Sequence, residues 1–172
     1  VRGQGRRRCC AVRPRRSVAL MLDTSAVLGW LERKTPGVSD AVRSTGATPL
    51  IHIATLAELQ EGVARAEAAG AASTEQRRQT LEFVLQRLGR PPGPSEVDAE
   101  CFGRLSACSS RKLSHNDKWI VAASIIGGHR LLTEDARLRA QVMSNAELDR
   151  MAVRRGWSSP QVVLVGPTGA NA

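Results

Sequence analysis

Four acidic residues stand where the sequence predicts that strands end and helices begin. Asp23 follows an apolar run directly, and Asp135 follows another within two residues. Glu58 and Asp117 lie in the first turns of two predicted helices. In open sheets of parallel strands, ligands gather at the carboxyl ends of the strands. The first turns of the helices lie at the same edge, so we expect these four carboxylates to converge on one site.

Such a group of acids indicates a bound hard cation. Each negative neighbour raises the free energy of ionising the next carboxyl group, so an empty cluster is unfavourable. Mg²⁺ removes that penalty, because it prefers oxygen ligands and keeps waters that it shares with a substrate phosphate. It also lowers the pKa of a bound water and neutralises charge on a phosphate. Phosphodiester hydrolysis is therefore the expected chemistry, with Asp23, Glu58, Asp117 and Asp135 as metal ligands and catalytic residues.

Each acid also has a purely structural interpretation. Thr55–Glu58 and Ser114–Asp117 both have the spacing of a helix capping box. Asp135 suits the N-cap of a helix, and Asp23 suits a turn at the end of a strand. The structural interpretation is weakest for Asp23, because burial is expected there and no Lys or Arg adjoins it in sequence.

The elements that must position these acids follow from the apolar pattern. Short apolar runs predict strands at 18–22, 48–54, 130–133 and 162–165. Helical periodicity, caps and Gly or Pro stops predict helices at about 25–32, 38–43, 55–69, 73–88, 95–110, 116–126 and 134–143. The helix over 116–126 is apolar almost all round, so we expect it to be buried on most sides. Strands interleaved with helices predict an α/β fold with a short, mostly parallel sheet flanked by helices.

Composition limits the classes of function. The chain has 172 residues, and we predict a single domain over 18–172 preceded by a disordered Arg-rich extension over 1–17. Residues 1–20 hold seven Arg and no acid, and without them the formal net charge falls from +9 to +2. An Arg-rich extension of this kind also suits phosphate backbones. Phe and Trp total five, with no Tyr, which disfavours a protein that binds single strands by base stacking.

The remaining features indicate an intracellular protein. The four Cys lack the spacing of a zinc site, so we expect free thiols in a reducing cytoplasm. No apolar run reaches the length of a membrane span, and the basic start lacks the apolar region of a secretory signal. We therefore expect a cytoplasmic location with no membrane partner.

Four sequence blocks resemble the PIN-domain family, and most closely the VapC toxins of bacterial toxin–antitoxin pairs. The resemblance covers roughly residues 18–145. The blocks are Met21-Leu-Asp-Thr-Ser-Ala-Val-Leu28, Thr55-Leu-Ala-Glu-Leu59, His115-Asn-Asp-Lys-Trp-Ile-Val-Ala-Ala-Ser124 and Leu131-Leu-Thr-Glu-Asp135. One block would be weak evidence, but four in the same order are fairly specific.

The resemblance implies a three-layer PIN-like fold and an endoribonuclease that depends on Mg²⁺ or Mn²⁺. It also implies inhibition by a VapB-like antitoxin and a homodimer. By position within the motifs, Asp23, Glu58, Asp117 and Asp135 match the four acids of the family. Thr24, Ser25 and Thr133 occupy small polar positions beside them, which suits residues that support the ligands or hold water. Glu61 and Glu134 are additional candidates, because each lies close in sequence to one of the four acids.

Two other functions compete with this interpretation. Phosphoryl transfer through a phospho-aspartate at Asp23 would, in haloacid-dehalogenase-type enzymes, need a second aspartate where this chain has Ser25. A catalytically inactive PIN fold that binds RNA or protein is the better alternative. Loss of a carboxylate would indicate that alternative, and all four are present.

Overall fold

A four-stranded parallel sheet forms the centre of the molecule. The computed structural model describes residues 18–88, 91, 93–108 and 113–166, so the Arg-rich extension predicted at 1–17 lies outside the described residues. The strands are β1 (Leu20–Leu22), β2 (Leu50–Ile51), β3 (Arg130–Thr133) and β4 (Gln161–Leu164), in the spatial order β2-β1-β3-β4. All three pairings are parallel.

The two central strands are far apart in sequence. β1 pairs with β3 so that Leu22 lies opposite Leu132. The Asp23 amide then continues the pairing by donating to the Leu132 carbonyl oxygen at 3.2 Å. The carboxyl ends of β1 and β3 therefore lie side by side, which brings the residues that follow each strand to the same edge of the sheet.

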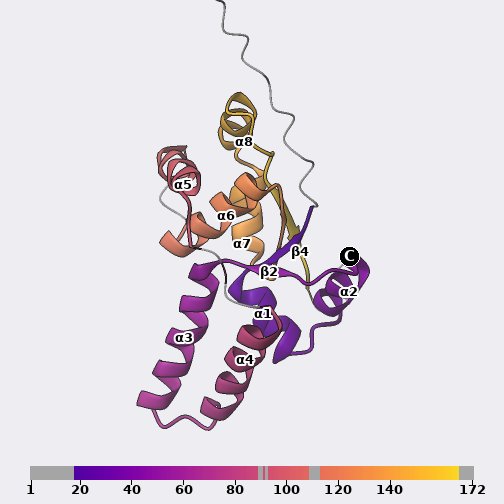
Figure 1. Ribbon diagram of the computed structural model, residues 1–172, viewed down its shortest axis with the longest axis vertical. Helices are drawn as coiled ribbons and strands as arrows, with labels where there is room; N and C mark the ends of the chain where they lie inside the picture. The colour runs from indigo at the N-terminus through magenta and orange to yellow at the C-terminus, as the bar shows by residue number, and fades with distance from the viewer. Residues whose placement is uncertain (1–17, 89–90, 92, 109–112, 167–172) are drawn as a thin grey trace, which may run out of the picture.

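Side chains alternate between the two faces of the sheet, and each face is covered by helices. Met21, Leu131 and Val162 belong to one apolar cluster, whereas Leu22 and Leu132 belong to the other. Figure 1 shows α5, α6, α7 and α8 on one side of the strands and α1 to α4 on the other. The predicted α/β class with a parallel sheet between helical layers is confirmed.

Eight helices connect or follow the strands in the described residues. They are α1 (Thr24–Leu31), α2 (Pro36–Thr45), α3 (Ile53–Ala68), α4 (Thr74–Arg87), α5 (Glu96–Cys108), α6 (His115–Gly127), α7 (Ala136–Met143) and α8 (Ala146–Arg154). As predicted, α6 is largely buried, with Ile120, Val121, Ala122, Ser124 and Ile125 shielded from solvent. None of the described helices is both long and apolar enough to traverse a bilayer.

The sequence-based predictions differ from the structure at three elements. The second strand is two residues long instead of seven, because the chain enters α3 at Ile53, two residues before the predicted start. His52 caps that helix by accepting a hydrogen bond from the Ala54 amide at Nδ1 (3.1 Å). The alternative interpretation of Thr55–Glu58 as a capping box is therefore wrong. α8, which follows its Asn145 cap, was not predicted.

The central strand β1 depends on its buried leucine for stability. We expect Leu22→Ala to lower the free energy of unfolding by about 3 kcal/mol, because its side chain is fully buried and truncation leaves a cavity. Leu50→Ala, in the edge strand β2 where the side chain is 38% exposed, is the matched control and loses much less. Urea unfolding measures both, and equal losses would contradict the assignment of Leu22 to the core.

Candidate active site

The Asp23 carboxylate is buried at the carboxyl end of β1. Only 5% of the residue is exposed. Asp23 is the N-cap of α1, and its Oδ1 accepts from the Ala26 amide (2.7 Å) and from Ser25 Oγ (2.8 Å). Its Oδ2 accepts from Thr133 Oγ1 at 2.5 Å. Three short hydrogen bonds therefore fix the orientation of a carboxylate that water hardly reaches.

Burial raises the pKa of the Asp23 carboxyl group above its ordinary value. Hydrogen bonds from Thr133, Ala26 and Ser25 lower this pKa in part, and the negative charge of Asp117 raises it further. In the described residues, no Lys, Arg or His forms an ion pair with Asp23. A carboxylate that is buried without a counter-charge is costly, so this position favours an external cation.

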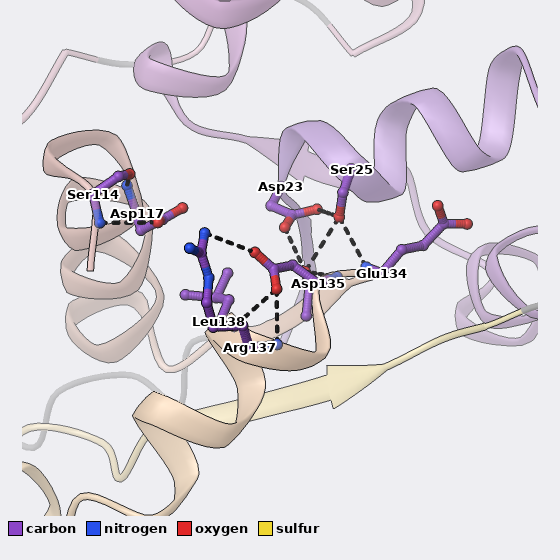
Figure 2. Close-up of polar contacts among 9 residues, drawn as sticks. Asp23, Ser25, Ser114, Asp117, Glu134, Asp135, Arg137 and Leu138 are labelled. Carbon is purple, nitrogen blue, oxygen red and sulfur yellow. Dashed lines mark hydrogen bonds and ion pairs between the residues drawn. The ribbon is translucent and has the colours of Figure 1, made fainter. Parts of the chain in front are cut away.

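Two hydroxyl groups connect Asp23 to the loop after β3. Ser25 Oγ accepts from the Glu134 amide at 2.8 Å and lies 3.2 Å from Thr133 Oγ1. Thr133 Oγ1 in turn accepts from the Asp135 amide at 2.9 Å. Ser25 and Thr133, two of the three small polar residues that the sequence placed beside the acids, thus form a network between β1 and β3. Figure 2 shows Asp23, Ser25, Glu134 and Asp135 of this network.

Glu58 lies on α3 and is held by two hydrogen bonds from residues beside the other acids. Its Oε1 accepts from Asn116 Nδ2 at 2.7 Å, and its Oε2 accepts a short hydrogen bond from Thr24 Oγ1. Thr24 and Asn116 directly follow and precede Asp23 and Asp117 in sequence, so Glu58 contacts the neighbours of both acids. The sequence prediction did not include Asn116, although it lies inside the quoted His115–Ser124 block.

Asp117 and Asp135 both cap helices. Asp117 Oδ2 accepts from the Ser114 amide at 3.1 Å, which completes the capping box predicted for α6. Asp135 Oδ1 accepts from the Arg137 and Leu138 amides at the start of α7, and its Oδ2 lies 3.6 Å from Arg137 Nη2. Figure 2 shows the Asp117 carboxylate on α6 turned toward Asp135 and Arg137.

The described residues bring the four acids to one edge of the sheet without joining them as one ligand set. Asp23 and Asp117 lie close enough for their charges to interact. Nowhere in the described parts of the chain do three or more His, Cys, Asp or Glu side chains form a group that could hold a metal ion. The tight four-acid cluster expected from the sequence is thus not assembled in this structure.

The donor set nevertheless suits Mg²⁺. This ion is commonly bound through one or two carboxylates, and waters and substrate phosphates complete its coordination. Asp23 and Asp117 supply two acids with interacting charges. Asp117 Oδ1 accepts no hydrogen bond from another described residue. The buried and unpaired charge of Asp23 is the observation that favours a cation here.

The two additional acids are each paired with an arginine. Glu134 forms an ion pair with Arg33, and its carboxylate points away from Asp23 in Figure 2. Gly29 makes room for it, since a Cβ there would collide with the Glu134 carboxylate. Glu61 pairs with Arg65 at 2.5 Å on α3. Both carboxylates thus have a cationic partner within the chain, unlike Asp23.

Comparison with known proteins shows the fold through solved structures. No family model and no curated protein matches the chain. The structure of VapBC2 from Rickettsia felis bound to a promoter DNA fragment is similar with a TM-score of 0.62 and 18% identity, covering 87% of this chain and 100% of that chain.

Two further structures agree. VapBC-5 from Mycobacterium tuberculosis, of the VapBC family of toxin–antitoxin systems, is similar with a TM-score of 0.58 and 25% identity over 86% of this chain and 99% of that chain. DNA-bound VapBC from Salmonella typhimurium is similar with a TM-score of 0.63 and 17% identity, covering 85% of this chain and 97% of that chain. The chain therefore has the PIN-like fold expected from the four sequence blocks.

Removing the Asp23 charge should stabilise the protein in the absence of metal. Because the pKa of the folded state is raised, the charged form opposes folding above that pKa, and the penalty disappears as the pH falls through it. We expect Asp23→Asn to raise the free energy of unfolding at pH 7, because the substitution removes the desolvation cost of the charged carboxylate. The Asn amide can donate to Thr133 Oγ1, so the network is preserved.

Urea unfolding in a metal chelator at pH 7 and pH 4 measures this effect. The gain should shrink at the lower pH, where the parent Asp23 takes up a proton. A variant that is less stable than the parent at pH 7 would contradict the assignment of Asp23 as a buried charge without a partner.

Proposed function

We propose that this chain is a metal-dependent endoribonuclease and the toxin of a VapBC-type toxin–antitoxin pair. The observation that carries the proposal is the buried Asp23 carboxylate, which has no cationic partner in the described residues and interacts with the charge of Asp117. It lies at the strand ends of a fold shared with several VapBC structures. Strand ends are where ligands bind in sheets of this class.

The acids are the residues that would hold Mg²⁺ or Mn²⁺. Asp23 and Asp117 are the principal ligands in this proposal, and Glu58 and Asp135 complete the site directly or through waters. A bound divalent ion supplies a water of lowered pKa and neutralises charge on the scissile phosphate. That chemistry suits a phosphodiester substrate, which presents hard oxygen atoms to the ion. The choice of RNA rests on the resemblance of the sequence blocks to VapC toxins.

The uncharged neighbours hold the acids in position. Ser25 and Thr133 each donate to one oxygen of Asp23 and so fix the plane of its carboxylate. Asn116 and Thr24 do the same for Glu58. Partners of this kind set the orientation and basicity of ligands, and their loss commonly costs 10–100-fold in activity or metal affinity.

The partners in this proposal are a VapB-like antitoxin and a second copy of the chain, acting in the cytoplasm. The antitoxin is supported by the similar structures, which are of VapBC proteins, one of them of a family of toxin–antitoxin systems. The homodimer rests on the resemblance of the sequence blocks to VapC toxins. The antitoxin would be encoded beside this chain, so the adjacent reading frame is the first place to look for it.

Loss of either principal acid should abolish RNA cleavage. We expect Asp23→Asn and Asp117→Asn to lower the metal-dependent cleavage rate by more than about 100-fold. Mutation of a residue that only hydrogen-bonds to a metal ligand already lowers activity or metal affinity by up to about that factor. Asp40→Asn is the matched control, since Asp40 is an exposed acid of α2 that pairs with Arg43. Cleavage of a labelled RNA pool by the purified chain, with Mg²⁺, with Mn²⁺ and with chelator, measures the rates.

Metal binding gives an independent readout. Mn²⁺ should raise the melting temperature of the parent and of Asp40→Asn, but not of Asp23→Asn. An active Asp23→Asn enzyme would contradict the proposal. A parent that neither cleaves RNA nor responds to metal would instead favour the inactive PIN-fold binding module.

A further inference from the structure

A groove of about 330 Å³ lies between α3 and α4, next to the candidate active site. Its lining includes Glu58 at one end, then Gly62 and Arg65 along α3, and Ser73 and Arg77 from the start of α4. Because Glu58 also takes part in the candidate site, the groove leads away from the carboxylates along one face of α3. Figure 1 shows the two helices as an extended antiparallel pair.

Arg77 is the unusual residue of this groove. Its side chain is half-buried, and its Nη1 approaches the Gly62 carbonyl oxygen at 3.5 Å. A Cβ at Gly62 would lie only 2.9 Å from the same Nη1, so the absence of a side chain at Gly62 leaves room for the Arg77 guanidinium. All sixteen Asp and Glu side chains belong to the described residues, and none forms an ion pair with Arg77.

The neighbouring arginines differ in this respect. Arg65 pairs with Glu61 at 2.5 Å, so these two charges in the groove largely offset each other. Arg78 pairs with Glu67 at 2.7 Å and lies within 3.9 Å of Glu75. Arg77 is therefore the charge in this groove that is left for an anionic ligand.

The position of Arg77 suits a phosphate next to the one being cut. Gly62, which Arg77 contacts, lies one helical turn beyond Glu58, or about 5.4 Å along α3. Arg77 and Glu58, one of the acids of the candidate site, therefore line the same groove about one helical turn apart. We propose that the α3–α4 groove binds the backbone of single-stranded RNA, with Arg77 contacting a phosphate adjacent to the scissile one.

This inference rests on the proposed nuclease function, because the scissile phosphate defines the direction of the strand. A guanidinium can contact a phosphate through two N–H groups, which makes arginine well suited to this role. An acidic segment of a protein partner is less favoured, since Glu58 at the end of the groove would repel it, whereas a phosphate there would share the proposed divalent ion.

Arg77→Gln tests the groove, with Arg78→Gln as the matched control that removes the same charge one residue away. Both are made in the full chain carrying Asp23→Asn, so that the RNA remains uncut. Binding of a fluorescent 12-nucleotide single-stranded RNA of mixed sequence is measured at several salt concentrations. Arg77→Gln should weaken binding about tenfold at low salt and reduce the slope of log K against log[salt] by about 0.7, the value for one lost phosphate contact on a single strand.

In the chain with Asp23 intact, Arg77→Gln should raise KM for RNA and leave kcat nearly unchanged, because the contact is made in both ground and transition states. Equal salt slopes for Arg77→Gln and Arg78→Gln would overturn the proposal, and so would an RNA that does not bind. Loss of antitoxin binding on Arg77→Gln with unchanged RNA affinity would overturn it in favour of a protein-binding groove.

These results are separable from the nuclease proposal. If the parent cleaves RNA in a metal-dependent way and the salt slope does not depend on Arg77, only the proposal that the α3–α4 groove binds RNA is refuted. An Arg77-dependent slope without any cleavage by the parent sustains RNA binding in the groove and removes the nuclease function.

Discussion

A carboxylate held inside the protein without a counter-charge is the constraint on which the site depends. Asp23 is buried because it directly follows a central strand, and its amide continues the pairing with β3. Its oxygens are satisfied by Ala26, Ser25 and Thr133, which stabilise the charge without neutralising it. The same hydrogen bonds that make the buried charge tolerable also fix its direction. Such an arrangement favours a cation supplied from outside the chain over an internal ion pair.

The general plan of the protein could be predicted from the sequence. Strand ends, helix caps and apolar runs are local signals, and they place Asp23 and Asp135 at one sheet edge with Asp117 on the first turn of α6. The distances between the acids could not be predicted, because they depend on helix packing, which local signals do not specify. Glu134 illustrates this limit. It is adjacent to Asp135 in sequence, yet its side chain packs against Gly29 and pairs with Arg33 instead of joining Asp23.

Capping and site roles, which looked like alternatives in the sequence, coexist in Asp117. One oxygen of that carboxylate completes the capping box of α6, and the charge of the same group still acts on Asp23. At Glu58 the capping interpretation failed, because an extended backbone at His52 and its ring nitrogen begin α3 earlier than Thr55. α8 was missed even though Asn145 and the apolar positions Leu148, Met151 and Ala152 carry a helical signal.

The hydrogen bond from Thr133 to Asp23 spans 110 residues of the chain. During translation, β1 leaves the ribosome long before its central neighbour β3 has been made. Contacts of such high sequence separation also form late in folding, since the intervening loop must be closed first. A nascent chain that ends before β3 therefore lacks the Thr133 hydroxyl, one of the three hydrogen-bond donors that orient the Asp23 carboxylate.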